Sequence, residues 1–248
     1  MVDLSRAEGE QTNSDQDYFN GLILGIGLAI IFYLTVIGSA GYLLQSLGKE
    51  KQNRVLEILL SSTRPVELLI GKMIGLGAIG LVQLVIWSVI VNVLMGSQNS
   101  FLANIELPQL DPGTWFLAIS FFLVGYLVYG SLFAGLGAVS PGQKESSQLT
   151  FFLMLPTFLP LWFNSILLNA PNQPPAVIMS LFPLTSPITM PMRLAITAVP
   201  VWQLGLSLAL GVLTSVGMLY IATRFFRSQN LLSGQSINLR RIMQAFRT

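Results

Sequence analysis

Residues 73–95 have the sequence MIGLGAIGLVQLVIWSVIVNVLM, which contains no charged side chain. A helix rises about 1.5 Å per residue, so about 20 apolar residues cross the hydrocarbon core of a bilayer. An amphipathic helix of a soluble protein would carry a regular polar face, with polar residues at every third or fourth position. This stretch lacks such a face, and it therefore predicts a membrane-spanning helix.

Further segments of the same kind lie on both sides of it. Each is long and apolar enough to cross a bilayer, and they are residues 21–44, 115–139, 149–168 and 202–222. The first is not a cleavable signal peptide, because it is too long, follows an acidic stretch and lacks a basic beginning. The sequence therefore predicts an all-α membrane protein with five transmembrane helices.

Composition excludes most other classes of protein. Only 10% of the residues are charged and 52% are hydrophobic, whereas soluble domains have about 25% charged residues. The chain has no cysteine and no histidine, which removes disulfides, thiolate metal sites, cysteine nucleophiles and the commonest general base. We therefore expect neither an ordinary soluble protein nor an enzyme.

A sixth apolar stretch, residues 176–199, is interrupted by prolines. Its sequence is AVIMSLFPLTSPITMPMRLAITAV, with Pro183, Pro187 and Pro191 four residues apart. Each proline would remove a backbone hydrogen bond from a continuous helix, and such losses are costly in lipid. We interpret this stretch as a re-entrant or interfacial helical hairpin broken by proline.

Basic residues alternate between the polar segments. Eleven of the 13 Lys and Arg residues lie in residues 45–72, 140–148 and 223–248, and the others are Arg6 and Arg193. The positive-inside rule then places the N-terminus outside and the C-terminus in the cytoplasm. The predicted organisation is an extracytoplasmic polar tail (1–20), a membrane domain (21–222) and a basic cytoplasmic tail (223–248).

The predicted spans contain no Asp, Glu, Lys or Arg. Ionisable residues inside the membrane are typical of proton relays, so their absence argues against a proton-driven transporter. Intramembrane proteases need paired Asp, Ser–His or two His residues, which the spans lack. Gly71-Lys72-Met73 is not part of a nucleotide-binding phosphate loop. If the chain moves a substrate, the energy comes from another protein.

Eight of the 24 charges lie in residues 48–72, GKEKQNRVLEILLSSTRPVELLIGK. On a helix from Lys49 to Leu60, one face would be apolar and the other would carry Glu50, Arg54 and Glu57; the apolar residues are Val55, Leu56, Leu59 and Leu60. This pattern predicts an amphipathic helix on the cytoplasmic surface. Such a helix is either a passive interfacial element or one that passes a push from a soluble partner to the spans.

Two motifs in this order resemble the permeases of ABC-2-type transporters. The first is EKQNRVLEILLSS at residues 50–62, followed by Pro65, Leu69, Gly71-Lys72 and Gly75. The second is FPLTSP at residues 182–187, with Met190 and Arg193. The resemblance covers roughly residues 20–225 and is closest to the branch that includes the sodium-efflux permease NatB.

The resemblance implies the membrane subunit of an exporter in the cell membrane. Its coupling helix, at about residues 49–64, would dock on a separate ABC ATP-binding subunit through Glu50, Lys51, Arg54 and Glu57. Pro183, Pro187 and Arg193 would belong to the outer-loop motif. A second copy or a related permease would complete the path. No cofactor is expected in this chain, since the partner uses the ATP.

The beginning of the chain differs from that of the family that it resembles. Family members usually begin with one more span and a large extracytoplasmic domain, and this chain has about 20 residues there.

The basic tail, with five arginines and no acid, is typical of contact with the anionic inner leaflet rather than with nucleic acid. The alternative function is a non-transporting membrane scaffold or assembly factor, or a degenerate half-permease.

Overall fold

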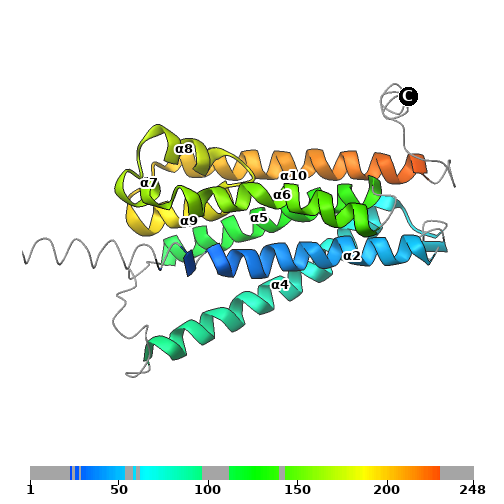
Figure 1. Cartoon of the computed structure of the whole chain (residues 1–248), viewed down its shortest axis with the longest axis horizontal. Helices are drawn as coiled ribbons and strands as arrows, with labels where there is room; N and C mark the ends of the chain where they lie inside the picture. The colour runs from blue at the N-terminus through cyan, green and yellow to red at the C-terminus, as the bar shows by residue number, and fades with distance from the viewer. Residues whose placement is uncertain are drawn as a thin grey trace, which may run out of the picture.

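The computed structural model describes residues 23, 26, 27, 29–53, 58, 59, 62–96, 112–139 and 143–229. These residues form helices and short connections, without a strand among them, so the predicted all-α fold is confirmed (Figure 1). The elements in chain order are the π-helix η1 (Tyr33–Ile37) and the helices α2 (Gly38–Gln52), α4 (Pro65–Gly96), α5 (Pro112–Val139), α6 (Gln143–Trp162), α7 (Asn164–Asn169), α8 (Pro174–Leu181), α9 (Ser186–Ile196) and α10 (Val201–Gln229).

Four stretches of described helix are long and apolar enough to cross a membrane. They are Ala29–Glu50, Pro65–Val91, Phe116–Gly137 and Val201–Phe225. They overlap four of the five predicted spans, and a protein with several membrane-spanning helices is confirmed.

The fifth predicted span, residues 149–168, is not confirmed as one crossing helix. The apolar part of α6 is Gln148–Trp162, and a turn at Phe163 separates it from the short α7. Pro156 and Pro160 lie inside α6. Because proline removes a backbone hydrogen bond and bends a helix, the apolar run divides here instead of continuing to residue 168.

Helix α5 is the centre of the bundle. It packs most extensively against α10 and also contacts α2 and α9. Half of the most apolar stretch of α5 is buried within the chain, whereas only 6% of the most apolar stretch of α4 is buried. Figure 1 shows α4 diverging from the other long helices towards its C-terminal end, while α7, α8 and α9 gather at one end of the bundle.

Small residues bring these helices close together. A Cβ atom placed on Gly125 of α5 would lie 2.6 Å from Cβ of Pro187 in α9 and 2.8 Å from a ring carbon of Phe32. A Cβ on Gly77 of α4 would lie 2.7 Å from the ring of Tyr126. Glycine at these positions allows the close approach that holds membrane helices together.

The proline-rich stretch forms the predicted helical hairpin. Helices α8 and α9 are separated by a break at residues 182–185, which contains Pro183. Pro187 lies in the first turn of α9, where the fixed φ of proline fits a helix. Pro191 lies inside α9. The position of this hairpin relative to the bilayer stays a prediction.

The first long helix, which comprises residues 29–32, η1 and α2, continues beyond its predicted end. Residue 44 was expected to end it, but α2 runs to Gln52 and Asn53 lies in a turn. Residues 49–52 therefore form the last turn of α2 and do not begin a separate amphipathic helix. Residues 54–57, 60 and 61 of the predicted coupling helix lie outside the described residues.

Candidate functional site

The end of α2 and the beginning of α4 are joined by an ion pair between Glu50 and Lys72. The Lys72 ammonium also donates to Oγ of Ser46 at 2.6 Å, and the Ser46 hydroxyl lies 3.2 Å from Oε1 of Glu50. The Lys72 and Glu50 side chains are only 17% and 23% exposed. A partly buried pair resists separation more than a surface pair does, so this contact fixes the two helices that flank residues 53–64.

The structure does not bring the four predicted coupling residues together. Glu50 faces Lys72 of its own chain. Lys51 continues the backbone of α2, but its side chain lies outside the described residues, as do Arg54 and Glu57. Sequence reasoning missed Lys72 as the partner of Glu50. The available signal was an isolated cation at the border of an apolar span, where it needs a counter-charge.

Two tyrosines on α5 connect this helix to two other segments of the chain. The Tyr126 hydroxyl donates to the Met73 carbonyl at 2.8 Å, next to Lys72 in α4. One turn further along, the Tyr129 hydroxyl donates to the Leu184 carbonyl at 2.6 Å, in the break of the hairpin. A buried tyrosine hydroxyl needs a partner, and both tyrosines find one on a neighbouring segment of chain.

Arg193, near the end of α9, is completely buried. One terminal nitrogen donates to Oγ of Ser180 at 2.6 Å and to Oε1 of Gln203 at 3.0 Å, and the other donates to Oδ1 of Asn172 at 3.2 Å. Its Nε is buried without a hydrogen-bond partner among the described residues. The guanidinium therefore joins α8, α9 and α10 through neutral oxygen atoms.

Hydroxyl groups complete the hairpin. Carbonyl groups at the end of a helix have no partner within that helix, and here Thr189 donates to the Met179 carbonyl at 2.9 Å. Ser207 of α10 donates to the Ser180 carbonyl at 2.8 Å. The predicted motif residues Pro183, Pro187 and Arg193 thus all lie in one hairpin, which is tied to both α5 and α10.

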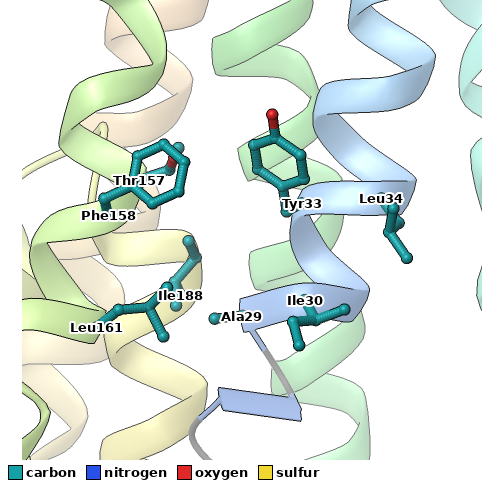
Figure 2. Close-up of a pocket in the computed structure, with 8 residues that line it drawn as sticks. All are labelled: Ala29, Ile30, Tyr33, Leu34, Thr157, Phe158, Leu161 and Ile188. Carbon is teal, nitrogen blue, oxygen red and sulfur yellow. The ribbon is translucent and has the colours of Figure 1, made fainter.

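An apolar pocket lies between the first long helix and α6 (Figure 2). Its volume is about 160 Å³. In Figure 2 Ala29 and Tyr33 face Thr157, Phe158 and Leu161 of α6; the complete lining is Ala29, Ile30, Tyr33, Leu34, Thr157, Phe158, Leu161 and Ile188. The rings of Tyr33 and Phe158 are 5.9 Å apart. Sequence reasoning missed this pocket, because apolar side chains give no signal that distinguishes a pocket from a core.

Comparison with known families decides the class of this protein. Residues 4–224 match the ABC-2 family transporter protein family. The chain belongs to this family. The resemblance seen in the sequence is therefore confirmed, and with its apolar helices this member of the ABC-2 family is a multi-pass membrane protein.

Two curated relatives are similar to this ABC-2 protein. The uncharacterized protein MJ1024 of Methanocaldococcus jannaschii is 28% identical over 233 residues, which is 93% of this chain and 55% of the relative. The uncharacterized protein YhaP of Bacillus subtilis is 27% identical over 248 residues, or 98% of this chain and 59% of the relative. The chain thus spans somewhat more than half the length of these relatives. No solved structure matches it.

The described residues of this ABC-2 family protein contain no group of three or more His, Cys, Asp or Glu side chains that could hold a metal ion. The polar contacts instead hold helices together. The ion pair joins α2 to α4, and the Arg193 contacts join α8, α9 and α10. Within the described part of the chain, these polar contacts link neighbouring helices to one another.

Proposed function

We propose that this chain is the permease subunit of an exporter that is powered by a separate ABC ATP-binding subunit. The observation that carries the proposal is the connection between α2 and α4, which is short and is flanked by the Glu50–Lys72 pair. Alternating access would follow when nucleotide-driven closure of the ATP-binding subunits pushes this connection. ATP is used by the partner, and this chain needs no cofactor of its own.

The contact with the ATP-binding subunit lies in residues 49–64. Glu50 would support this contact indirectly, because it is paired with Lys72 and holds the end of α2 against α4. Lys51, Arg54 and Glu57 are then the polar residues proposed to meet the partner. Since the ion pair joins the two flanking helices beside the connection, a push there would act on both α2 and α4.

The proposed topology places the N-terminus outside and the C-terminus in the cytoplasm. The positive-inside rule supports it, because basic residues gather in residues 45–72, 140–148 and 223–248. Figure 1 shows α6 running from the end at which α5 finishes back to the end that holds α7, α8 and α9. Its 20 residues span about 30 Å, so α6 would serve as the fifth, proline-bent crossing of the bilayer.

A second permease copy or a related permease would complete the transport path. Helix α4 supports this proposal, because its apolar window is only 6% buried within one chain and α4 diverges from the bundle in Figure 1. Lipid or another helix must cover such an apolar surface in the membrane. The rest of the surface would face the lipid bilayer.

Charge reversal tests the docking assignment. Glu57→Lys should abolish co-purification of the ATP-binding subunit, because the reversed charge meets the same partner surface. Glu106→Lys makes the same change in residues 97–111, which the proposed topology places between α4 and α5 on the outer side of the membrane, and should leave the complex intact. If the ATP-binding subunit still co-purifies with Glu57→Lys and substrate still stimulates its ATP hydrolysis, the docking assignment is wrong.

A further inference from the structure

The pocket between the first long helix and α6 is lined almost entirely by hydrocarbon. Two hydroxyl groups lie in its lining, and both are already occupied. The Thr157 hydroxyl donates to the Met154 carbonyl at 2.6 Å, and the Tyr33 hydroxyl donates to the Met154 sulfur at 3.7 Å. The other lining side chains are apolar. A charged or strongly hydrated ligand would lose much of its hydration here, where two hydroxyl oxygens are the polar atoms that the lining side chains still offer as acceptors.

The size of the pocket suits one small apolar group. An enclosed cavity of about 150 Å³ lined by Leu, Ile and Phe binds benzene, and this pocket, which is open on one side, has a similar volume of about 160 Å³. The rings of Tyr33 and Phe158 lie 5.9 Å apart at 47°, so an aromatic ring or a short alkyl chain can lie against them.

The pocket lies where a compound dissolved in the bilayer can reach it. Ala29–Glu50 is a candidate membrane span, and it contributes four of the lining residues. At the edge of the pocket, Ile30 is 50% and Leu34 is 40% exposed. A lipophilic compound that partitions into the hydrocarbon would thus meet the pocket directly.

A metal cation finds no acidic ligands in this half of the molecule. From Ser146 to Thr248 the sequence contains no Asp or Glu. This range includes most of α6 and all of α7 to α10, and it contains the buried cation Arg193. Hard cations bind to carboxylate, carbonyl and water oxygens, whereas a fixed positive charge repels them.

Both walls of the pocket are weakened helices. The first long helix has π-helical hydrogen bonding at Tyr33–Ile37, and Tyr33 and Leu34 line the pocket. On the other wall, Pro156 and Pro160 flank Thr157 and Phe158 inside α6. π-Helical turns occur frequently at functional sites, and proline lets a helix bend. Small movements of either wall would therefore change the volume of the pocket.

We propose that this pocket binds the aromatic or alkyl part of the exported compound, so that the cargo is a lipophilic molecule and not a metal cation. This inference rests on the proposed export function and names its substrate class. The tail of a bilayer lipid has the same chemistry, and the experiment separates a transported group from a resident lipid.

The test uses the permease co-expressed with its ATP-binding subunit and reconstituted in phosphatidylcholine vesicles. ATP hydrolysis is measured against increasing N-phenyl-1-naphthylamine, a neutral aromatic probe, and separately against NaCl. Ile30→Trp fills the pocket from a half-exposed position, and Leu34→Trp is a second variant of the same kind. Val216→Trp makes a similar change on α10 at a side chain that is 61% exposed and outside the pocket.

The probe should stimulate ATP hydrolysis and NaCl should not. Ile30→Trp and Leu34→Trp should each raise the half-maximal probe concentration about tenfold, the effect of losing the burial of roughly two methylene groups. Val216→Trp should match the unchanged protein. Stimulation by NaCl alone, or an equal response of the pocket variants and the control, overturns the inference.

A second arm uses phosphatidylcholine that carries a diazirine on one acyl chain. Excess aromatic probe should lower photo-crosslinking of this lipid to the pocket residues in the unchanged protein. Crosslinking that does not change with probe and ATP means a resident lipid and overturns the inference. Failure of the ATP-binding subunit to co-purify would instead refute the proposed function, so the two failures are distinguishable.

Discussion

Two cations are held in contrasting ways at different places in the bundle. Lys72 is paired with the carboxylate of Glu50, and both side chains keep some exposure to solvent. Arg193 is completely buried and is held by the neutral oxygens of Ser180, Gln203 and Asn172. Both cations join helices, but only the first has a counter-charge among the described side chains.

The difference separates a junction that can open from one that cannot. Water can reach Lys72 and Glu50 when they part, so their separation has a modest cost. Burial lowers the pKa of the Arg193 guanidinium from its ordinary value, because the charged form loses its hydration. Moving Arg193 would leave its acceptors buried without donors. We therefore expect α2 and α4 to rearrange during transport while α8, α9 and α10 move as a unit.

The largest effect is expected at Arg193. Arg193→Ala removes three hydrogen bonds and leaves a cavity, and it should lower the free energy of unfolding by about 3 kcal/mol. Thermal unfolding in detergent, followed by size-exclusion chromatography, measures the loss. Arg224 is exposed and lies over the ring of Tyr220 at 4.9 Å, so Arg224→Ala should cost less than about 1 kcal/mol. Equal losses in the two variants would contradict the importance of burial.

The ion pair should give a smaller but coupled effect. Glu50→Gln and Lys72→Met should each lower the free energy of unfolding by about 1–2 kcal/mol, because each leaves a partly buried charge unpaired. In the double variant the losses should not add, with a coupling energy of about 1 kcal/mol in the same thermal assay. Strictly additive losses would mean that the contact contributes nothing to holding α2 against α4.

The two tyrosines of α5 test the same difference, because Tyr126 bonds next to Lys72 and Tyr129 bonds to the hairpin that holds Arg193. Tyr129→Phe and Tyr126→Phe should each lower stability by about 1 kcal/mol, the net contribution of one hydrogen bond. Hydrogen exchange should locate the effects differently. Tyr129→Phe should speed exchange near Leu184, and Tyr126→Phe should speed it near Met73. The two variants are controls for each other, and the same exchange pattern in both would refute the separation.

The smallest effect is expected at the surface pair Arg64–Glu67. Its side chains are 86% and 61% exposed, and the closest charged atoms are 3.9 Å apart. Glu67→Gln should change stability by less than about 0.5 kcal/mol. A loss as large as that of Glu50→Gln in the same assay would show that partial burial is not what makes the Glu50–Lys72 contact stronger.

Hydropathy was sufficient to predict most of the fold. The long apolar runs became the long helices, because any backbone in lipid must satisfy its own hydrogen bonds. The three spaced prolines correctly predicted a broken hairpin. The predicted span at residues 149–168 divides at Phe163, because hydropathy averages over a window and does not register where prolines bend a helix.

The site was less predictable, because its main features depend on tertiary contacts. The charges at Lys49, Glu50 and Lys51 indicated a surface helix, whereas pairing with Lys72 lets α2 continue to Gln52. Arg193 was identified from the sequence as a motif residue. Its burial was not predicted, because the partners that hold it are neutral side chains, which the sequence does not mark as contacts of an arginine. The pocket could not be predicted from the sequence, because its residues come from three separate helices and are nearly all apolar.

The π-helical segment Tyr33–Ile37 rotates the side chains that precede it about the helix axis, relative to those that follow it. A π-helical turn contains one more residue than an α-helical turn, and each residue corresponds to a rotation of about 100°. Deleting Leu34 would restore α-helical phase and turn Ala29 and Ile30 about the axis, away from Phe158 and Leu161. Residues 38–52 would keep their register against α4 and α5. One deletion can therefore uncouple the pocket from the Glu50–Lys72 junction within a single helix.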